Sequence, residues 1–273
     1  MIDAEPDSTA HDCDGTPAVR GAAVCPGRLR VYLGAAPGVG KTVAMLAEGR
    51  RRAERGTDVV VAVVEDHGRE YTAAQLAGIE TVARRAVAHR GITLTDMDLP
   101  AVLARRPQVA LVDELAHTNA PGSEHAKRWQ DVTALLDAGI DVITTVNIQH
   151  LESLNDVVAA ITGIVQSETV PDQVVRSAGQ VELVDMTPEA LRRRMSHGHV
   201  YPPNMIDPAL ANYFREGNLG ALRELALLWV ADPLRPAAHS RTRLSLPMLD
   251  ELVPAITITA LLLAPPGSAA SST

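Results

Sequence analysis

The stretch that most constrains the fold is residues 29–42, an apolar run that breaks into Gly34-Ala35-Ala36-Pro37-Gly38-Val39-Gly40-Lys41-Thr42. The apolar run is typical of a buried strand, and the glycines allow a tight turn into a following helix. Backbone N–H groups in such a turn, together with the positive end of the helix dipole, attract an anion. The stretch therefore predicts a strand, a phosphate-binding loop and a helix, in that order.

The residue types of this loop assign a role to each part of it. Lys41 would reach the outer phosphates of a nucleotide, and the Thr42 hydroxyl would bind Mg²⁺. The strict pattern has glycine six residues before the lysine, whereas this chain has Ala35 there and Gly34 one position earlier. We expect the nucleotide to contact Gly34, Ala35, Pro37, Gly38, Val39, Gly40, Lys41 and Thr42.

A second apolar stretch, residues 107–114, ends in the adjacent carboxylates Asp113 and Glu114 about seventy residues after the loop. This is the form of a Walker B strand, in which Asp113 would hold Mg²⁺ and Glu114 would polarise an attacking water. The alternative is that the two carboxylates are only an acidic end to a strand. Pairing with the loop favours the nucleotide site.

The next apolar stretch, residues 141–146, is followed by Asn147. Ligands of open α/β sheets bind at the carboxyl ends of the strands, so Asn147 could sense a terminal phosphate or position a water. Capping of the helix that follows is an equally good interpretation of Asn147.

Strand-like and helix-like stretches alternate along the chain, and this predicts a parallel sheet with helices on both faces. Besides residues 30–33, strands are expected at 58–64, 82–87, 109–113, 141–146 and 180–184. Helices are expected at 43–55, 73–79, 99–105, 126–136, 151–162 and 188–195, with one or two more within 206–230. The fold class is therefore α/β, a P-loop NTPase-like parallel sheet of about five to six strands sandwiched by helices.

Composition divides the chain into three parts: a disordered leader at 1–27, the α/β domain at 28–232, and a low-complexity, mostly disordered tail at 233–273. A net charge of −8 argues against nucleic acid as a partner. No secretory segment opens the sequence, and the apolar stretch 252–263 is too short to span a bilayer. We expect a cytoplasmic chain without a membrane span.

Several longer segments resemble the N-terminal sensory domain of the KdpD-type osmosensitive potassium-channel sensor histidine kinases. The resemblance covers about residues 28–232 and is carried by 34–42 (GAAPGVGKT), 64–69 (VEDHGR), 113–123 (DELAHTNAPGS), 127–131 (KRWQD), 139–156 (GIDVITTVNIQHLESLND) and 217–226 (GNLGALRELA). It implies a cytoplasmic domain that binds ATP with Mg²⁺ and tunes kinase against phosphatase action toward a response regulator of potassium transport. Gly38, Gly40, Lys41 and Thr42 match the family's nucleotide site, with Asp113 as the Mg²⁺ partner. The resemblance also covers Ala35, since the family's loop shows the same departure from the strict pattern.

The chain contains no phosphoacceptor histidine box and no glycine-rich kinase lid, so we do not expect it to phosphorylate itself on histidine. The expected partner is a sensor kinase core or a response regulator, and association with a membrane would pass through a partner sensor. Slow ATP hydrolysis involving Glu114 is compatible with this role. The alternative is a free-standing P-loop NTPase or a small-molecule (nucleoside) kinase, which the lack of an obvious acceptor pocket disfavours.

Overall fold

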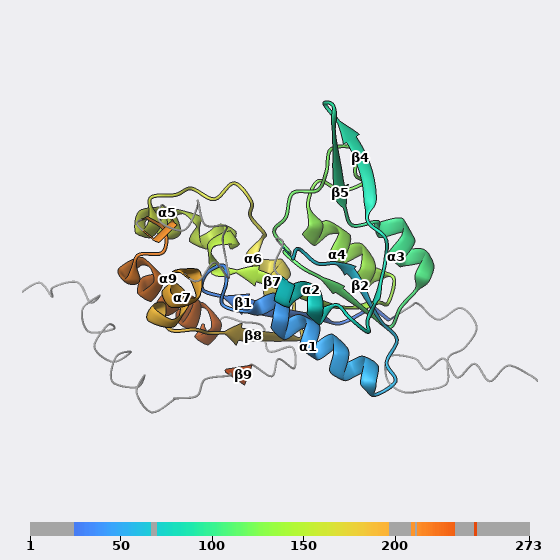
Figure 1. The fold of residues 1–273 in the computed structure, drawn as a ribbon, viewed down its shortest axis with the longest axis horizontal. Helices are drawn as coiled ribbons and strands as arrows, with labels where there is room; N and C mark the ends of the chain where they lie inside the picture. Colours follow the sequence, from blue (N-terminus) through green and yellow to red (C-terminus); the bar gives the residue numbers. More distant parts are fainter. Residues whose placement is uncertain (1–24, 67–69, 197–208, 211, 233–242, 245–273) are drawn as a thin grey trace, which may run out of the picture.

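The fold is built on a parallel β-sheet, seen in a computed structural model that describes residues 25–66, 70–196, 209–210, 212–232 and 243–244 (Figure 1). The sheet order is β3-β2-β6-β7-β1-β8-β9. Its strands are β1 (Leu29–Gly34), β2 (Val59–Val63), β3 (Glu80–Thr81), β6 (Val109–Val112), β7 (Asp141–Asn147), β8 (Gln180–Val184) and β9 (Arg243–Leu244). All neighbouring strands pair in parallel. The predicted α/β architecture is confirmed, and the two-residue strands β3 and β9 lie at the edges.

Both faces of the sheet are apolar, because the central strands are runs of apolar residues and successive side chains of a strand point to opposite faces. Tyr32, Val61 and Leu111 belong to one apolar cluster, together with Met45 and Leu46 of the helix α1 (Lys41–Glu54). The alternate residues of the same strands belong to a larger cluster, to which several other helices contribute. These helices are α3 (Leu99–Arg105), α4 (Arg128–Asp137), α5 (Asn155–Thr162), α6 (Asp172–Arg176), α7 (Pro188–Ser196) and α9 (Glu216–Ala231).

One predicted strand is wrong: residues 82–87 do not form a strand of the central sheet. Instead β4 (Arg85–His89) pairs antiparallel with β5 (Ile92–Asp96). The turn between them has two residues, Arg90 and Gly91, both with positive φ, which is the geometry that a tight hairpin requires. Residues of β4 are mostly exposed, and the hairpin stands out from the rest of the chain in Figure 1.

The helices agree with the predictions except at three places. The segment 73–79 contains only the end of α2 (Glu70–Gln75), and α6 is additional. Two 3₁₀ turns, η1 (Ile148–His150) and η2 (Glu152–Leu154), precede α5. Residues 206–208 and 211 of the predicted closing segment lie outside the described residues, as do most of the leader and tail predicted to be disordered.

Candidate functional site

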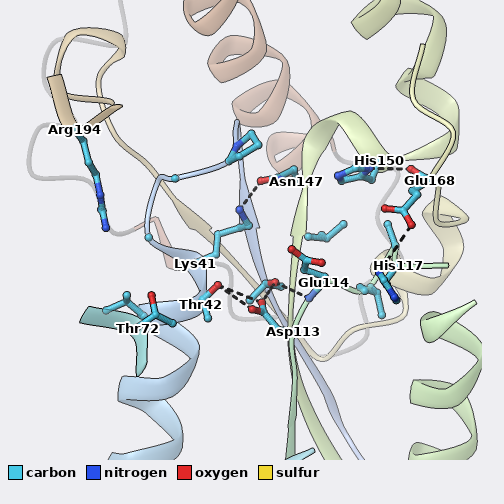
Figure 2. A pocket seen from close by; sticks show the side chains of 18 residues that line it. Lys41, Thr42, Thr72, Asp113, Glu114, His117, Asn147, His150, Glu168 and Arg194 are labelled. Carbon is cyan, nitrogen blue, oxygen red and sulfur yellow. Dashed lines mark hydrogen bonds and ion pairs between the residues drawn. The ribbon is translucent and has the colours of Figure 1, made fainter. Parts of the chain in front are cut away.

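The candidate residues come together at the carboxyl edge of the sheet, where β1, β6 and β7 end. One pocket there is lined by Pro37, Gly38, Gly40, Lys41, Thr42, Asp113, Glu114 and Asn147, all of them predicted from the sequence (Figure 2). Ala35 and Val39 are buried instead, and neither they nor Gly34 line the pocket. The parallel topology therefore assembles the site from three separate segments.

The glycine-rich loop, residues 34–42, depends on glycine at specific positions. Gly38 and Gly40 have φ of 89° and 107°, and Gly40 caps the first turn of α1. At Gly34, a Cβ atom would lie 2.7 Å from Val39 Cγ2 and 2.8 Å from Lys41 Cδ. Close approach thus requires glycine at position 34, whereas the buried site at 35 accommodates an alanine.

Lys41 is buried at the start of α1, and its Nζ donates a hydrogen bond to Asn147 Oδ1. The two residues meet because Gly34 of β1 is in register with Asn147 of β7. Asn147 is the N-cap residue of η1, but its side chain makes no capping hydrogen bond there. The amide holds the lysine at the pocket instead.

Asp113 is almost fully buried, 1% exposed, and is surrounded by donors. The Thr42 hydroxyl lies 3.1 Å from Oδ2, Thr145 Oγ1 donates to Oδ1, and the Glu65 N–H lies 3.3 Å from Oδ2. Burial raises the pKa of the Asp113 carboxyl; hydrogen bonding from Thr145 opposes this rise, and the charge of Glu114 adds to it. A buried carboxylate beside a hydroxyl is a donor set that fits a hard cation such as Mg²⁺.

Glu114 follows directly and lines the pocket. Its φ of 55° is uncommon for a residue other than glycine, and its N–H donates to Thr145 Oγ1 at 3.1 Å. Figure 2 shows the Glu114 carboxylate in the pocket between Lys41 and His117. The side chain is placed where it could polarise a water next to a phosphate.

Behind the pocket, the fully buried Arg128 fixes the end of β6. Its Nη1 donates to the Asp113 carbonyl oxygen at 3.0 Å, and its Nη2 donates to Asp96 Oδ1 at 2.9 Å. Asp96 Oδ2 also accepts the Ala120 N–H at 2.8 Å. This network joins the Asp113 backbone to the hairpin and to the loop that follows β6.

The pocket contains residues that the sequence analysis did not single out: Thr72, Thr145, Glu168 and Arg194. A signal exists for Thr145, because a hydroxyl in an apolar central strand needs a buried partner. Glu168 is held at the pocket by His150, whose Nδ1 lies 2.8 Å from the Glu168 carbonyl oxygen. Burial lowers the pKa of His150 below its usual value of 6.5.

The fold and site define an α/β protein with a glycine-rich loop facing a buried aspartate across the carboxyl edge of a parallel sheet. Residues 25–234 match the family described as "Osmosensitive K+ channel His kinase sensor domain". The chain belongs to this family, the KdpD sensor domains. Among the described residues, no helix has the length and apolar character needed to cross a bilayer.

Similar proteins carry the same family name. The chain is 68% identical over 206 residues to "Sensor protein KdpD" of Mycobacterium tuberculosis (strain CDC 1551 / Oshkosh), covering 76% of this chain and 24% of that protein. Identity to "Sensor protein KdpD" of Escherichia coli (strain K12) is 56%, over 76% of this chain and 23% of that protein. For the "Putative sensor protein KdpD" of Synechocystis sp. (strain ATCC 27184 / PCC 6803 / Kazusa), identity is 52%, and 76% and 56% are covered. The chain thus spans about a quarter of the length of the first two.

Proposed function

We propose that this chain is an ATP- and Mg²⁺-binding regulatory domain of a potassium-responsive two-component system, where it tunes the kinase and phosphatase output of a sensor toward a response regulator. The observation that carries the proposal is the hydrogen bond between Thr42 and Asp113. The two oxygen donors expected of a nucleotide-bound Mg²⁺ are thus adjacent: the Thr42 hydroxyl lies 3.1 Å from Asp113 Oδ2, and both residues line one pocket. Membership of the KdpD sensor-domain family supports the regulatory part.

Each side chain of the site has a role in this proposal. The N–H groups of the glycine-rich loop and the N-terminus of α1 would receive the phosphates, and Lys41 would exchange its bond to Asn147 for a phosphate oxygen. Thr42 and Asp113 would hold Mg²⁺, which neutralises phosphate charge when it is bound. Glu114 would orient a water, so slow hydrolysis accompanies binding.

The phosphate part of the proposal is tested by calorimetric titration of ATP with Mg²⁺ into the wild-type chain and the Lys41→Ala variant. A hydrogen bond to a charged group contributes about 1.5–3 kcal/mol, so we expect affinity to fall by at least about tenfold. Lys127→Ala is the matched control, because Lys127 Nζ contacts Thr118 Oγ1 rather than the pocket. Unchanged affinity in Lys41→Ala would contradict the proposal.

The regulatory part is tested by activity. Incubation of the chain with ATP, Mg²⁺ and a panel of hydroxyl and nucleoside acceptors should give no transfer at ordinary enzyme rates. Turnover on the order of 1 to 1000 per second with any acceptor would instead identify a small-molecule kinase.

A further inference from the structure

Arg194 approaches the glycine-rich loop from α7, whereas the site residues predicted from the sequence lie at or just after the ends of β1, β6 and β7. It lies in the last turn of α7 and lines the same pocket as Lys41 and Thr42. A Cβ atom added to Gly40 would be 3.8 Å from Arg194 Nη1, so the guanidinium lies beside the first turn of α1. Figure 2 shows Arg194 extending along the loop toward the side of the pocket where Thr42 and Thr72 lie.

Within the described part of the chain, the Arg194 guanidinium has no hydrogen bond or ion pair. Other arginines nearby are bound: Arg192 Nη1 donates to the Phe214 and Leu210 carbonyl oxygens, and Arg223 makes a bidentate contact with Asp185. Lys41, the other cation of the pocket among these residues, is bound to Asn147. Arg194 is thus a half-buried cation with five N–H donors that lines the pocket and has no carboxylate partner among the described residues.

The backbone that carries Arg194 is held in place by the core. Leu191 and Met195, on either side of it in α7, are 2% and 0% exposed and belong to the main apolar cluster. The core thus anchors the backbone of α7 on both sides of Arg194, so the cation is presented to the pocket before any ligand is bound. Attraction of a cation to the C-terminal end of the helix dipole does not explain why Arg194 points into the pocket, because the same attraction acts on Arg193, which is exposed.

We propose that Arg194 is a ligand of the phosphate chain of the bound nucleotide, on the side of the glycine-rich loop opposite Asn147. The inference rests on the proposed nucleotide function and adds a residue to it. A planar guanidinium with free donors binds phosphate oxygens in a bidentate manner, which a lysine cannot do. Arg194 would then complete an enclosure of which the loop N–H groups, Lys41 and Mg²⁺ form the other sides.

The first test compares the affinities of the wild type, Arg194→Ala, Arg194→Lys and the neighbouring control Arg193→Ala for ATP with Mg²⁺. We expect Arg194→Ala to weaken binding by about 10- to 100-fold, Arg194→Lys by less, and Arg193→Ala by no more than about twofold. Equal affinities of the wild type and Arg194→Ala would overturn the inference while leaving the nucleotide site in place. A wild type that does not bind ATP would refute the proposed function and, with it, this inference.

The second test uses the wild-type chain alone and so does not depend on how the variants fold. Phenylglyoxal, which modifies arginine, is applied with and without saturating ATP and Mg²⁺, and the modified residues are read by mass spectrometry. We expect ATP to protect Arg194 and to leave Arg193 reactive. Reactivity of Arg194 that stays unchanged while calorimetry reports bound ATP would contradict the assignment.

Discussion

Replacement of Arg128 by methionine tests how the buried network behind the site stabilises the fold. Arg128 is 0% exposed, and Asp96, its partner at 2.9 Å, is 3% exposed. Burial acts to raise the pKa of Asp96, but hydrogen bonds from the Ala120 N–H and from Arg128 outweigh it and hold the pKa below its usual value. Without the arginine, the charge of Asp96 remains buried with backbone donors only.

The expected loss follows from that burial. Removal of one partner of a buried ion pair costs about 3–5 kcal/mol, because the other charge is left uncompensated. Asp96 keeps the N–H groups of Ala120 and Met97, so we expect a loss near the lower end, about 3 kcal/mol. The Asp113 carbonyl oxygen also loses its donor, which loosens the end of β6.

The measurement is urea unfolding followed by tryptophan fluorescence, with Arg105→Met as the matched control. Arg105 makes four hydrogen bonds to Asp58 and Glu80, twice the number that Arg128 makes to Asp96 and the Asp113 carbonyl, yet its side chain is 35% exposed. Solvent screens such a pair, so the control should change stability little.

The double variant Arg128→Met with Asp96→Asn separates the effect of the uncompensated Asp96 charge from the effect of the donor lost by the Asp113 carbonyl oxygen. It removes the uncompensated charge, so we expect it to recover part of the stability that Arg128→Met loses. The reasoning from burial is refuted if Arg105→Met destabilises the chain as much as Arg128→Met does. It is also refuted if the stability lost by the double variant equals the sum of the losses of the single variants Arg128→Met and Asp96→Asn.

Three further predictions concern the loop, the acid side of the stability curve and hydrolysis. Gly34→Ala should leave the chain folded but weaken ATP binding by about tenfold, since the methyl group displaces the Lys41 side chain; calorimetry with circular dichroism checks both parts. Burial acts to raise the pKa of Asp172, but hydrogen bonds from Ser153 and from Trp229 Nε1 leave it lowered. Its contribution is present above the unfolded pKa, about 3.9, and is lost as pH falls through the folded value, so Asp172→Asn should flatten the fall in stability below about pH 4 in acid unfolding. Glu114→Gln should abolish slow phosphate release from ATP, whereas an unchanged rate would mean that the carboxylate only ends the strand.

Features encoded locally could be predicted from the sequence. The order of strand, glycine-rich loop and helix follows from residues 29–42, and α1 ends at Glu54, two residues before Gly56, as that glycine indicates. The position of the adjacent carboxylates 113–114 at the end of a strand likewise follows from the apolar run that precedes them. The parallel sheet then follows from the alternation of strands and helices.

Features that depend on strand order could not be predicted. Thr145 reaches Asp113 only because β7 lies between β1 and β6, and a single sequence does not contain that order. Arg194 sits in a run of three arginines that indicates only a charged helix face. The hairpin was missed because Val82 and Val87 favour a buried strand, whereas the turn at Arg90 and Gly91 decides the pairing.

The most direct test of the central claim is a crystal structure of the chain with a non-hydrolysable ATP analogue and Mg²⁺. The account predicts phosphates against the N–H groups of the glycine-rich loop, Lys41 Nζ moved from Asn147 to a phosphate oxygen, and Mg²⁺ held on the side of Thr42 and Asp113. A nucleotide bound elsewhere, with Lys41 still on Asn147 and Thr42 still on Asp113, would contradict it.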